Sequence, residues 1–312
     1  MSRFRVLVSC PLIQDDVHEY DDLFAEHGIE YDVPEIDQQL DEPRLLEIID
    51  RYDGVIAGDD EFTARVFAAA DRLRVVSKWG VGVDNVDTEA AAEHGVTVTR
   101  TPGAFSDEVA DVVIGYAIML TRELHDIDRA VRNGEWICPR GVSLRGKTFG
   151  VVGVGDIGSA VVERAHAHGM EVLGHDVEPI PDDLRDRTGV EPVDLDELFA
   201  RADLVSLNCA LTEATRNMVG ERELDALGPE GYLLNTARGE LVDQAALVDA
   251  LETGAVAGAA LDVYAEEPLP ADDPLAELDN VVLGTHNAQN TVEAVQDVHD
   301  RAVRNLIDGL TE

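Results

Sequence analysis

Three glycines and one aspartate lie at spacings that suit a bound dinucleotide. Gly153, Gly155 and Gly158 follow an apolar run in the order G-x-G-x-x-G, and Asp176 ends the next apolar run. In this order the first glycine allows a tight turn, the second lets the backbone approach a pyrophosphate, and the third lets a helix pack close to the strand. The helix amides can then bind phosphate, and the aspartate can accept from ribose hydroxyls. The stretch therefore predicts a dinucleotide-binding turn.

The identity of the dinucleotide follows from Asp176. A carboxylate here repels the 2′-phosphate of NADP, and the next residues, VEPIPDD, include no Arg or Lys that could receive one. The sequence therefore predicts NAD. The triplet Gly146-Lys147-Thr148 precedes the strand instead of following it, so we interpret it as an entry turn and not as a phosphate loop.

An arginine ends another apolar run. Residues 233–243 read LLNTARGELVD, which places Arg238 after a predicted buried strand and directly before a glycine. A guanidinium is costly to desolvate, so a strand that ends on one predicts an anionic partner.

The chain is strongly acidic. Its 312 residues include 64 Asp and Glu against 24 Lys and Arg, for a net charge of −40, and its only lysines are Lys78 and Lys147. Hydrophobic residues still make up 45% of the chain, enough for two domains with cores. We interpret the composition as adaptation to a very salty cytoplasm, because about 1 M salt screens charge repulsion to roughly 3 Å. The alternative is an unusually acidic protein of ordinary cells. Nucleic acid and anionic membranes are poor partners for either.

Other kinds of site and location are disfavoured. Cys10, Cys138 and Cys209 are far apart and not in metal-ligand spacing, so we expect no disulfide and no metal site. The N-terminal MSRFRVLVSC runs into a strand pattern and lacks the apolar core of a signal peptide. Since no apolar run approaches the roughly 18 residues of a membrane span, we expect a cytoplasmic protein.

Short apolar runs alternate with helical patterns along the chain. Continuous runs rich in β-branched residues predict buried parallel strands at 4–10, 52–58, 73–80, 149–155, 170–176, 202–210, 231–237 and 256–264. Helical patterns lie between them, for example at 61–71 and 241–253. A longer helix is expected after the Thr-Pro-Gly turn at 101–103, with Ser106 as its N-cap. The alternation predicts an α/β, doubly wound, parallel-sheet architecture.

Together these motifs resemble those of the D-isomer-specific 2-hydroxyacid dehydrogenases, in particular the phosphoglycerate dehydrogenase-like branch. The resemblance runs nearly from end to end, through GVGVDNVD (80–87), VVGVGDIG (151–158), LLNTARGELVD (233–243), ALDVYAEEP (260–268) and GTHNA (284–288). It implies two Rossmann-like domains with the active site in the cleft between them. It also implies a substrate-binding domain at 1–99 plus 290–312, an NAD-binding domain at 100–289, and a homodimer.

The resemblance further implies a catalytic triad of Arg238, Glu267 and His286. Hydride addition to the C2 carbonyl of a 2-keto acid creates an alkoxide, which the imidazolium of His286 can protonate. The carboxylate of Glu267 would hold the imidazole in orientation and favour its charged form. A guanidinium recognises a carboxylate at two points. We therefore interpret the anion beside Arg238 as the carboxylate of a small 2-hydroxy or 2-keto acid.

The remaining contacts are carried over from the same resemblance. The nicotinamide carboxamide is expected at Asp262, and the substrate carboxylate at the backbone of Val81 and Gly82. Lys78 is interpreted either as a further substrate contact or as a strand residue with a solvated ammonium. The predicted cofactor contacts are Gly153, Gly155, Asp156, Ile157, Gly158, Asp176, Cys209, Ala237 and Asp262.

Several positions depart from the family pattern. Asn208 and Ala210 stand where a histidine and a proline are common. Asp59, Asp60 and Glu61 occupy a region in which phosphoglycerate dehydrogenases commonly carry basic residues, which disfavours a phosphorylated substrate.

The leading hypothesis is an NAD-dependent oxidoreductase that transfers a hydride between nicotinamide and C2 of a small D-2-hydroxy or 2-keto acid. Phosphoglycerate dehydrogenase proper is one alternative. A formate- or phosphite-oxidising relative is another, although the formate enzymes carry glutamine where Glu267 stands. The third is a non-catalytic, NAD(H)-sensing corepressor, which would need an exposed apolar groove for its partners.

Overall fold

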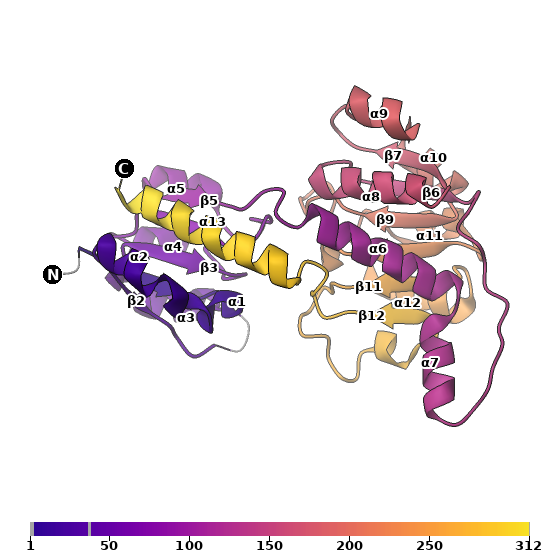
Figure 1. Cartoon of the computed structure of the whole chain (residues 1–312), viewed down its shortest axis with the longest axis horizontal. Coiled ribbons are helices and arrows are strands. Elements are labelled where there is room, and N and C mark those ends of the chain that lie inside the picture. Colours follow the sequence, from indigo (N-terminus) through magenta and orange to yellow (C-terminus); the bar gives the residue numbers. More distant parts are fainter. Residues whose placement is uncertain (1–2, 37–38, 312) are drawn as a thin grey trace. The chain divides into compact units, whose positions relative to one another are not determined.

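The computed structural model describes residues 3–36 and 39–311, which form two compact units (Figure 1). The first unit combines residues up to Ala104 with those from Thr291 onward, and the second runs from Phe105 to Asn290. The boundaries expected from the sequence are 99/100 and 289/290. Each unit is built on a parallel sheet, which confirms the predicted fold class.

A five-stranded sheet in the order β2-β1-β3-β4-β5 forms the centre of the first unit. Its strands are β1 (Phe4–Val8), β2 (Ile29–Asp32), β3 (Gly54–Ala57), β4 (Val75–Lys78) and β5 (Thr97–Thr99). Its helices are α1 (Pro11–Gln14), α2 (Asp21–Glu26), α3 (Glu42–Ile48), α4 (Ala64–Ala69) and α5 (Thr88–Glu93), with 3-10 turns η1 (Val17–Tyr20) and η2 (Ile49–Arg51). The central strands β3 and β4 are buried at every position, as expected for a parallel sheet covered by helices.

The last helix, α13 (Val292–Thr311), packs against β3 and β4. Figure 1 shows it, in yellow, lying along the sheet of the first unit. Its buried face includes Val298 and Leu306, and the Ser77 hydroxyl on β4 donates to the Ala302 carbonyl at 2.8 Å. The end of the chain therefore completes the first unit's core.

A seven-stranded parallel sheet in the order β12-β11-β10-β9-β6-β7-β8 forms the centre of the second unit. Its strands are β6 (Thr148–Val152), β7 (Glu171–His175), β8 (Glu191–Pro192), β9 (Leu204–Leu207), β10 (Tyr232–Asn235), β11 (Gly258–Leu261) and β12 (Val281–Leu283). Its helices are α6 (Ser106–Thr121), α7 (Leu124–Arg132), α8 (Asp156–Ala167), α9 (Asp182–Thr188), α10 (Leu195–Arg201), α11 (Glu221–Leu227) and α12 (Gln244–Thr253), with 3-10 turns η3 (Gly239–Leu241) and η4 (Pro274–Glu277).

The strand order of the second sheet reverses between β6 and β9. From β6 the chain builds outward through β7 and β8, and from β9 it builds in the other direction to β12. Helices α6 and α8 pack together on one core, and α10, α11 and α12 pack on another. A reversal of this kind leaves a crevice at the carboxyl ends of the two strands, where α/β proteins bind ligands.

The observed elements match most of the sequence predictions. Seven of the eight predicted strands contain an observed strand, and the eighth, at 149–155, overlaps β6, which begins one residue earlier at Thr148. The predicted helices at 61–71 and 241–253 contain α4 and α12. The prediction that Ser106 is an N-cap is wrong. Phe105 is the cap residue, and Ser106 is the first residue of α6 and makes no capping hydrogen bond. None of the helices within the described ranges is long and apolar enough to cross a membrane.

Candidate active site

A histidine and a glutamate meet at the carboxyl ends of β11 and β12. These strands are parallel neighbours with Leu261 opposite Leu283, so the loops that follow them start side by side. His286 Nδ1 lies 2.8 Å from Glu267 Oε2. Because an ionised carboxylate can only accept, this bond places a proton on Nδ1. Tyr264 N donates to the other glutamate oxygen at 2.9 Å, which fixes the carboxylate.

The backbone of His286 has an uncommon conformation. Its φ is +54°, in the left-handed region that residues other than glycine seldom adopt. Two bonds from Asp262 bracket it: the Asp262 carbonyl accepts from His286 N at 2.6 Å, and Asp262 Oδ2 accepts from Ala288 N at 2.8 Å. Asp262 is 1% exposed. The residue predicted to contact nicotinamide therefore also shapes the histidine loop.

Arg238 lies at the end of the neighbouring strand, β10. It is half-buried, and the Asn235 side chain shapes its turn by donating to the Arg238 carbonyl at 2.8 Å and accepting from Ala237 N at 3.1 Å. Gly239 follows, and a Cβ there would lie 1.9 Å from the Tyr264 carbonyl carbon. The arginine turn therefore passes directly against the loop that carries Glu267.

The glycine turn has the geometry that the spacing predicts. Gly153 has φ +87°, and a Cβ on it would lie 2.6 Å from Cys209 N at the end of β9. A Cβ on Gly158 would lie 1.9 Å from the Gly153 carbonyl oxygen. By contrast, a Cβ on Gly155 would meet no atom within 4 Å, so the backbone there is open to a ligand. The residues of this turn fit a bound pyrophosphate at the start of α8.

The other predicted cofactor residues surround this turn. Asp176 Oδ2 accepts from Val154 N at 2.6 Å, and Oδ1 accepts from Glu178 N at 2.9 Å, so its carboxylate ties the turn to the end of β7. Cys209 is half-buried, and burial raises the pKa of its thiol to about 11. Asp156 is exposed to solvent, and Ile157 and Ala237 are half-buried.

The predicted substrate residues of the first unit differ in exposure. Val81 and Gly82 are partly exposed in the loop after β4. The interpretation of Lys78 as a residue with a solvated ammonium is wrong, because its side chain is 3% exposed. Its Nζ donates to the Gly58 carbonyl and to Asp59 Oδ1, the latter at 2.6 Å. The ammonium is therefore already bonded to a carboxylate.

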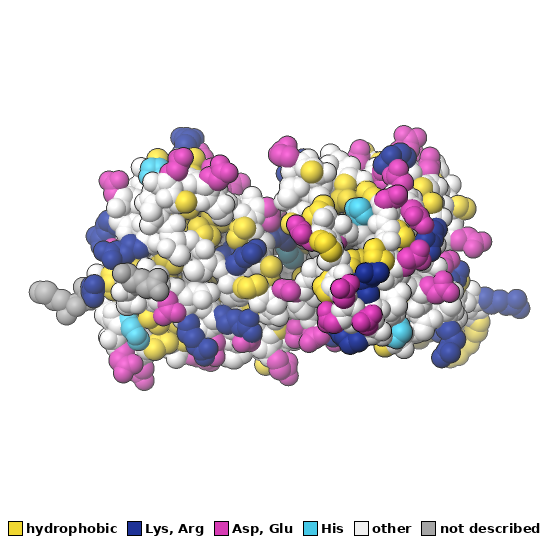
Figure 2. All heavy atoms as spheres, turned by 90° about the horizontal axis from the view of Figure 1, so that it is seen from above, with side chains coloured by type: hydrophobic (Ala, Val, Ile, Leu, Met, Phe, Trp, Pro, Cys, Tyr) yellow, Lys and Arg dark blue, Asp and Glu magenta, His cyan; other side chains and the backbone are white. Residues whose placement is uncertain are grey.

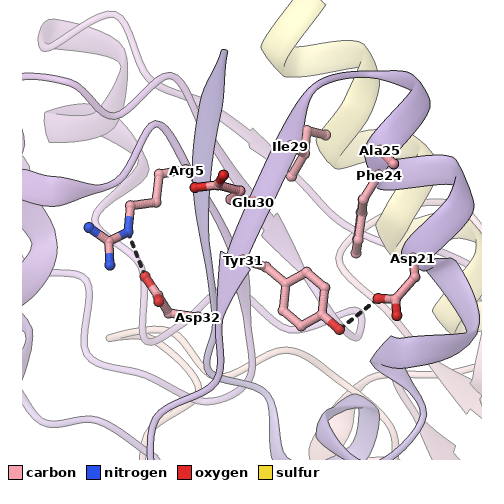
Figure 3. A pocket seen from close by; sticks show the side chains of 8 residues that line it. All are labelled: Arg5, Asp21, Phe24, Ala25, Ile29, Glu30, Tyr31 and Asp32. Atoms are coloured by element: carbon pink, nitrogen blue, oxygen red, sulfur yellow. Dashed lines mark hydrogen bonds and ion pairs between the residues drawn. The ribbon is translucent and has the colours of Figure 1, made fainter. Parts of the chain in front are cut away.

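A surface pocket of about 380 Å³ lies elsewhere in the first unit, beside the edge strand β2 (Figure 3). Its polar side chains bond to one another: Arg5 Nε donates to Asp32 Oδ2 at 2.7 Å, and the Tyr31 hydroxyl donates to Asp21 Oδ1 at 2.8 Å. None of the predicted site residues lines it. Within the described part of the chain, no three His, Cys, Asp or Glu residues are grouped to hold a metal ion.

One contact at the site was not predicted from the sequence. The Tyr116 hydroxyl on α6 donates to Asp262 Oδ1 at 3.1 Å, across 146 residues of chain. In the sequence Tyr116 stands in an apolar helical stretch, YAIML (116–120). This pattern is typical of a helix that packs on a core and gives no signal for a functional site.

Comparison with known proteins places this geometry in a family. Residues 114–288 match the model of the D-isomer specific 2-hydroxyacid dehydrogenase, NAD binding domain. A glyoxylate reductase of Thermofilum pendens is 41% identical over 254 residues, covering 80% of this chain and 75% of the relative. A D-3-phosphoglycerate dehydrogenase of Methanocaldococcus jannaschii is 38% identical over 294 residues, covering 93% of this chain and 54% of the relative. The crystal structure of a glyoxylate reductase from Paecilomyes thermophila has a TM-score of 0.88 at 29% identity, covering 100% of this chain and 97% of that one.

Two glycine substitutions separate folding from cofactor binding. Gly158→Ala places a Cβ against the Gly153 carbonyl, and overpacking of this kind costs about 1–3 kcal/mol, so the melting temperature should fall. Gly155→Ala has open space for its Cβ and a φ of −77° that alanine adopts, so the melting temperature should hold. Its affinity for NADH should fall by roughly tenfold, or about 1.4 kcal/mol, because the methyl group faces the pyrophosphate. Thermal melts and calorimetric titration with NADH measure both quantities. A Gly155→Ala variant that binds NADH normally would contradict the assignment of this turn.

Proposed function

The chain belongs to the D-isomer-specific 2-hydroxyacid dehydrogenase family and binds NAD. We propose that it catalyses the reduction of a small 2-keto acid to the D-2-hydroxy acid. The observation that carries the proposal is the 2.8 Å bond between His286 Nδ1 and Glu267 Oε2. It joins an acid-base group to a carboxylate on the same sheet edge as the cofactor turn. NADH supplies the hydride when it is bound at that turn.

His286 is the proton donor in this proposal. Because Nδ1 is bonded to Glu267, Nε2 is the nitrogen that gives its proton to the oxygen on C2 as the hydride arrives. The products are the hydroxy acid, NAD⁺ and a neutral imidazole, which takes up a proton from water before the next turnover. The same steps in reverse oxidise the hydroxy acid. Glu267 keeps the ring oriented and stabilises the imidazolium.

Arg238 binds the substrate carboxylate in the proposal. A guanidinium makes two parallel hydrogen bonds to a carboxylate, and charged bonds are each worth roughly 1.5–3 kcal/mol. Asn235 and Gly239 hold its turn against the loop of Glu267. We assign NAD binding to the second unit and further substrate contacts, at Val81 and Gly82, to the first.

Removal of the imidazole tests the acid directly. In His286→Ala, kcat for reduction of glyoxylate or hydroxypyruvate should fall by about 10²–10⁴, the usual contribution of a placed general acid. NADH affinity should stay near that of the unaltered protein. His166→Ala, which removes an exposed histidine from α8, is the matched control and should keep its turnover. Steady-state kinetics with full turnover in His286→Ala would remove this residue from the mechanism.

We propose that the substrate carries no phosphate. A phosphate group needs a cation to bind it, and the one lysine of the first unit, Lys78, is buried and bonded to Asp59. Asp60 beside it is fully buried and accepts from Ser9, Gly58 and Leu40. Burial raises the pKa of Asp60, with Lys78 acting in the opposite direction. This end of the first sheet thus offers more acids than cations.

Substrate preference tests this point. The kcat/KM for hydroxypyruvate should exceed that for 3-phosphohydroxypyruvate by about tenfold or more. This is the difference expected when the phosphate lacks one charged hydrogen bond. Asp59→Asn removes the charge that neutralises Lys78 and should narrow the ratio. Asp71→Asn, at an exposed position of the same unit, is the control and should leave it unchanged. A preference for the phosphorylated substrate would favour phosphoglycerate dehydrogenase instead.

We propose that the protein works in a cytoplasm of high salt concentration. Figure 2 shows acidic side chains distributed over the visible face instead of gathered in one patch. With a net charge of −40, the folded chain repels itself strongly in dilute buffer. In about 1 M salt the range over which these charges repel one another falls to roughly 3 Å.

The salt dependence of stability follows from this charge. The melting temperature should be higher in 2 M KCl than in 0.1 M KCl, and reductase activity should follow the same order. Thermal melts at equal pH in the two buffers decide the point. A sulfate-free salt is used because sulfate also strengthens hydrophobic burial and would hide the effect of screening. A higher melting temperature in the dilute buffer would contradict salt adaptation.

We also propose a homodimer that forms through α7 and the segment after it. Figure 1 shows α7 and this segment extending away from the sheet of the second unit. Large apolar side chains are exposed along it, including Leu124, Val131, Ile137 and Trp136, the last 86% exposed. Several large apolar side chains exposed within one short segment favour a protein interface there.

One charge in this segment should separate the subunits. Trp136→Asp places a carboxylate where the proposed interface buries an indole, and the sedimentation coefficient should fall to that of a monomer. Val292→Asp, at an apolar position 85% exposed in the first unit, is the control and should keep the dimer. Sedimentation velocity in high salt measures both. A monomeric unaltered protein, or a dimeric Trp136→Asp variant, would refute this interface.

A further inference from the structure

The left-handed backbone of His286 needs neighbours that impose it. A residue other than glycine in this conformation costs on the order of 1–3 kcal/mol and persists only where surrounding contacts fix it. Asp262 accepts two hydrogen bonds from this stretch: its carbonyl accepts from His286 N and its carboxylate from Ala288 N, two residues further on. A third bond, from Gln289 Nε2 to the His286 carbonyl, lies on the loop itself. The Asp262 carbonyl thus binds the histidine's own amide, and the Asp262 carboxylate fixes the chain just after it at Ala288.

Tyr116 fixes that orientation. Its hydroxyl donates to Asp262 Oδ1 at 3.1 Å while Ala288 N donates to Oδ2, so each carboxylate oxygen has its own donor. Tyr116 is half-buried on α6, against the core of the second unit. Burial, and after it the charge of Asp262, raises the pKa of the tyrosine, which keeps its proton on the phenol. The hydroxyl is thus a permanent donor.

Gly284, just after β12, passes so close to the bond between Tyr116 and Asp262 that no side chain fits at this position. A Cβ on Gly284 would lie 2.1 Å from Asp262 Oδ1 and 2.3 Å from the Tyr116 hydroxyl. The Gly284 carbonyl in turn accepts from the Tyr264 hydroxyl at 2.8 Å. Gly284 is two residues before His286, so the backbone that leads into the histidine passes directly over the tyrosine–aspartate bond. Helix α6, the end of β11 and the end of β12 meet at this one point.

We propose that Tyr116 is a positioning residue for the reaction: through Asp262 it holds the loop 284–288 so that His286 delivers its proton to the substrate. The inference rests on the proposed function, because it assigns Tyr116 a part in the use of His286 as the acid. Tyr116 itself touches neither His286 nor Glu267 in any bond described above, and it acts only through Asp262.

Tyr116→Phe removes the hydroxyl and keeps the ring in the core. Loss of a hydrogen bond to a charged group predicts a fall of roughly tenfold or more in kcat. The KM for the keto acid should stay within about twofold, because Arg238 is unaltered. NADH affinity is measured beside it, because Asp262 is also the predicted nicotinamide contact. A loss of NADH affinity as large as the loss of kcat would place the effect at that contact and overturn the inference. Tyr232→Phe is the matched control, since Tyr232 packs against the same core without a bond to Asp262, and it should keep its kcat.

The same substitution in a His286→Ala background separates positioning from general stability. Once the imidazole is gone, its placement no longer matters, so Tyr116→Phe should cause no further loss of kcat. Equal fold-losses in both backgrounds, or an unchanged kcat in the single variant, would overturn the inference. If Tyr116→Phe does not fold, Gly284→Ala, whose Cβ would lie against both partners of the same hydrogen bond, should show the same selective loss of kcat. If His286→Ala is fully active, the proposed function itself fails. If His286→Ala is impaired while Tyr116→Phe is normal, only the role of Tyr116 fails.

Discussion

The hydrogen bond between His286 Nδ1 and Glu267 Oε2 is the interaction on which the candidate site depends. Its two residues come from loops after different strands, so it forms only where β11 and β12 run parallel as neighbours. The bond places a proton on Nδ1 and leaves Nε2 as the nitrogen that can exchange a proton with the substrate. The Asp262 contacts and the Tyr264 amide then hold the two loops at the spacing that the bond needs.

The charge of the chain sets a second constraint. A protein of net charge −40 repels its own anionic ligands, a keto acid and a dinucleotide. Attraction must therefore come from local groups: the Arg238 guanidinium and the amides at the start of α8. At high salt the long-range repulsion is screened while these short contacts remain. The same composition that we propose for a salty cytoplasm is thus compatible with binding anions at these two places.

Much of the fold could be predicted because its central strands are buried on both faces. Runs such as FGVVGVG and YLLN are continuously apolar, and glycines or asparagine end them where the parallel strands end. The four edge strands β2, β5, β8 and β12 were not predicted. Each is only two to four residues long, too short to show a clear alternation or a long apolar run. Ser106 resembled an N-cap by type, but the turn before α6 places it one residue inside the helix.

The candidate site was predictable in its residue types and only partly in its contacts. The glycine spacing and the order of Arg238, Glu267 and His286 were available from the chain. The burial of Lys78 against Asp59 was not, because the sequence does not show whether the ammonium at this strand end is solvated or paired with a carboxylate from another strand. Nor was the bond from Tyr116 to Asp262, since it joins residues 146 positions apart and depends on how α6 crosses the sheet. Pairings of this kind are set by tertiary packing, which local sequence does not encode.

A double-mutant cycle on the pair tests the central claim most directly. The values of kcat for keto-acid reduction would be measured for Glu267→Gln, His286→Asn and the double variant, with NADH affinity as the check on folding. If the two residues act as one acid, the double variant should be about as slow as His286→Asn alone, because the carboxylate has no role without the ring. Losses that multiply in the double variant would show that the two side chains act independently and would contradict the account.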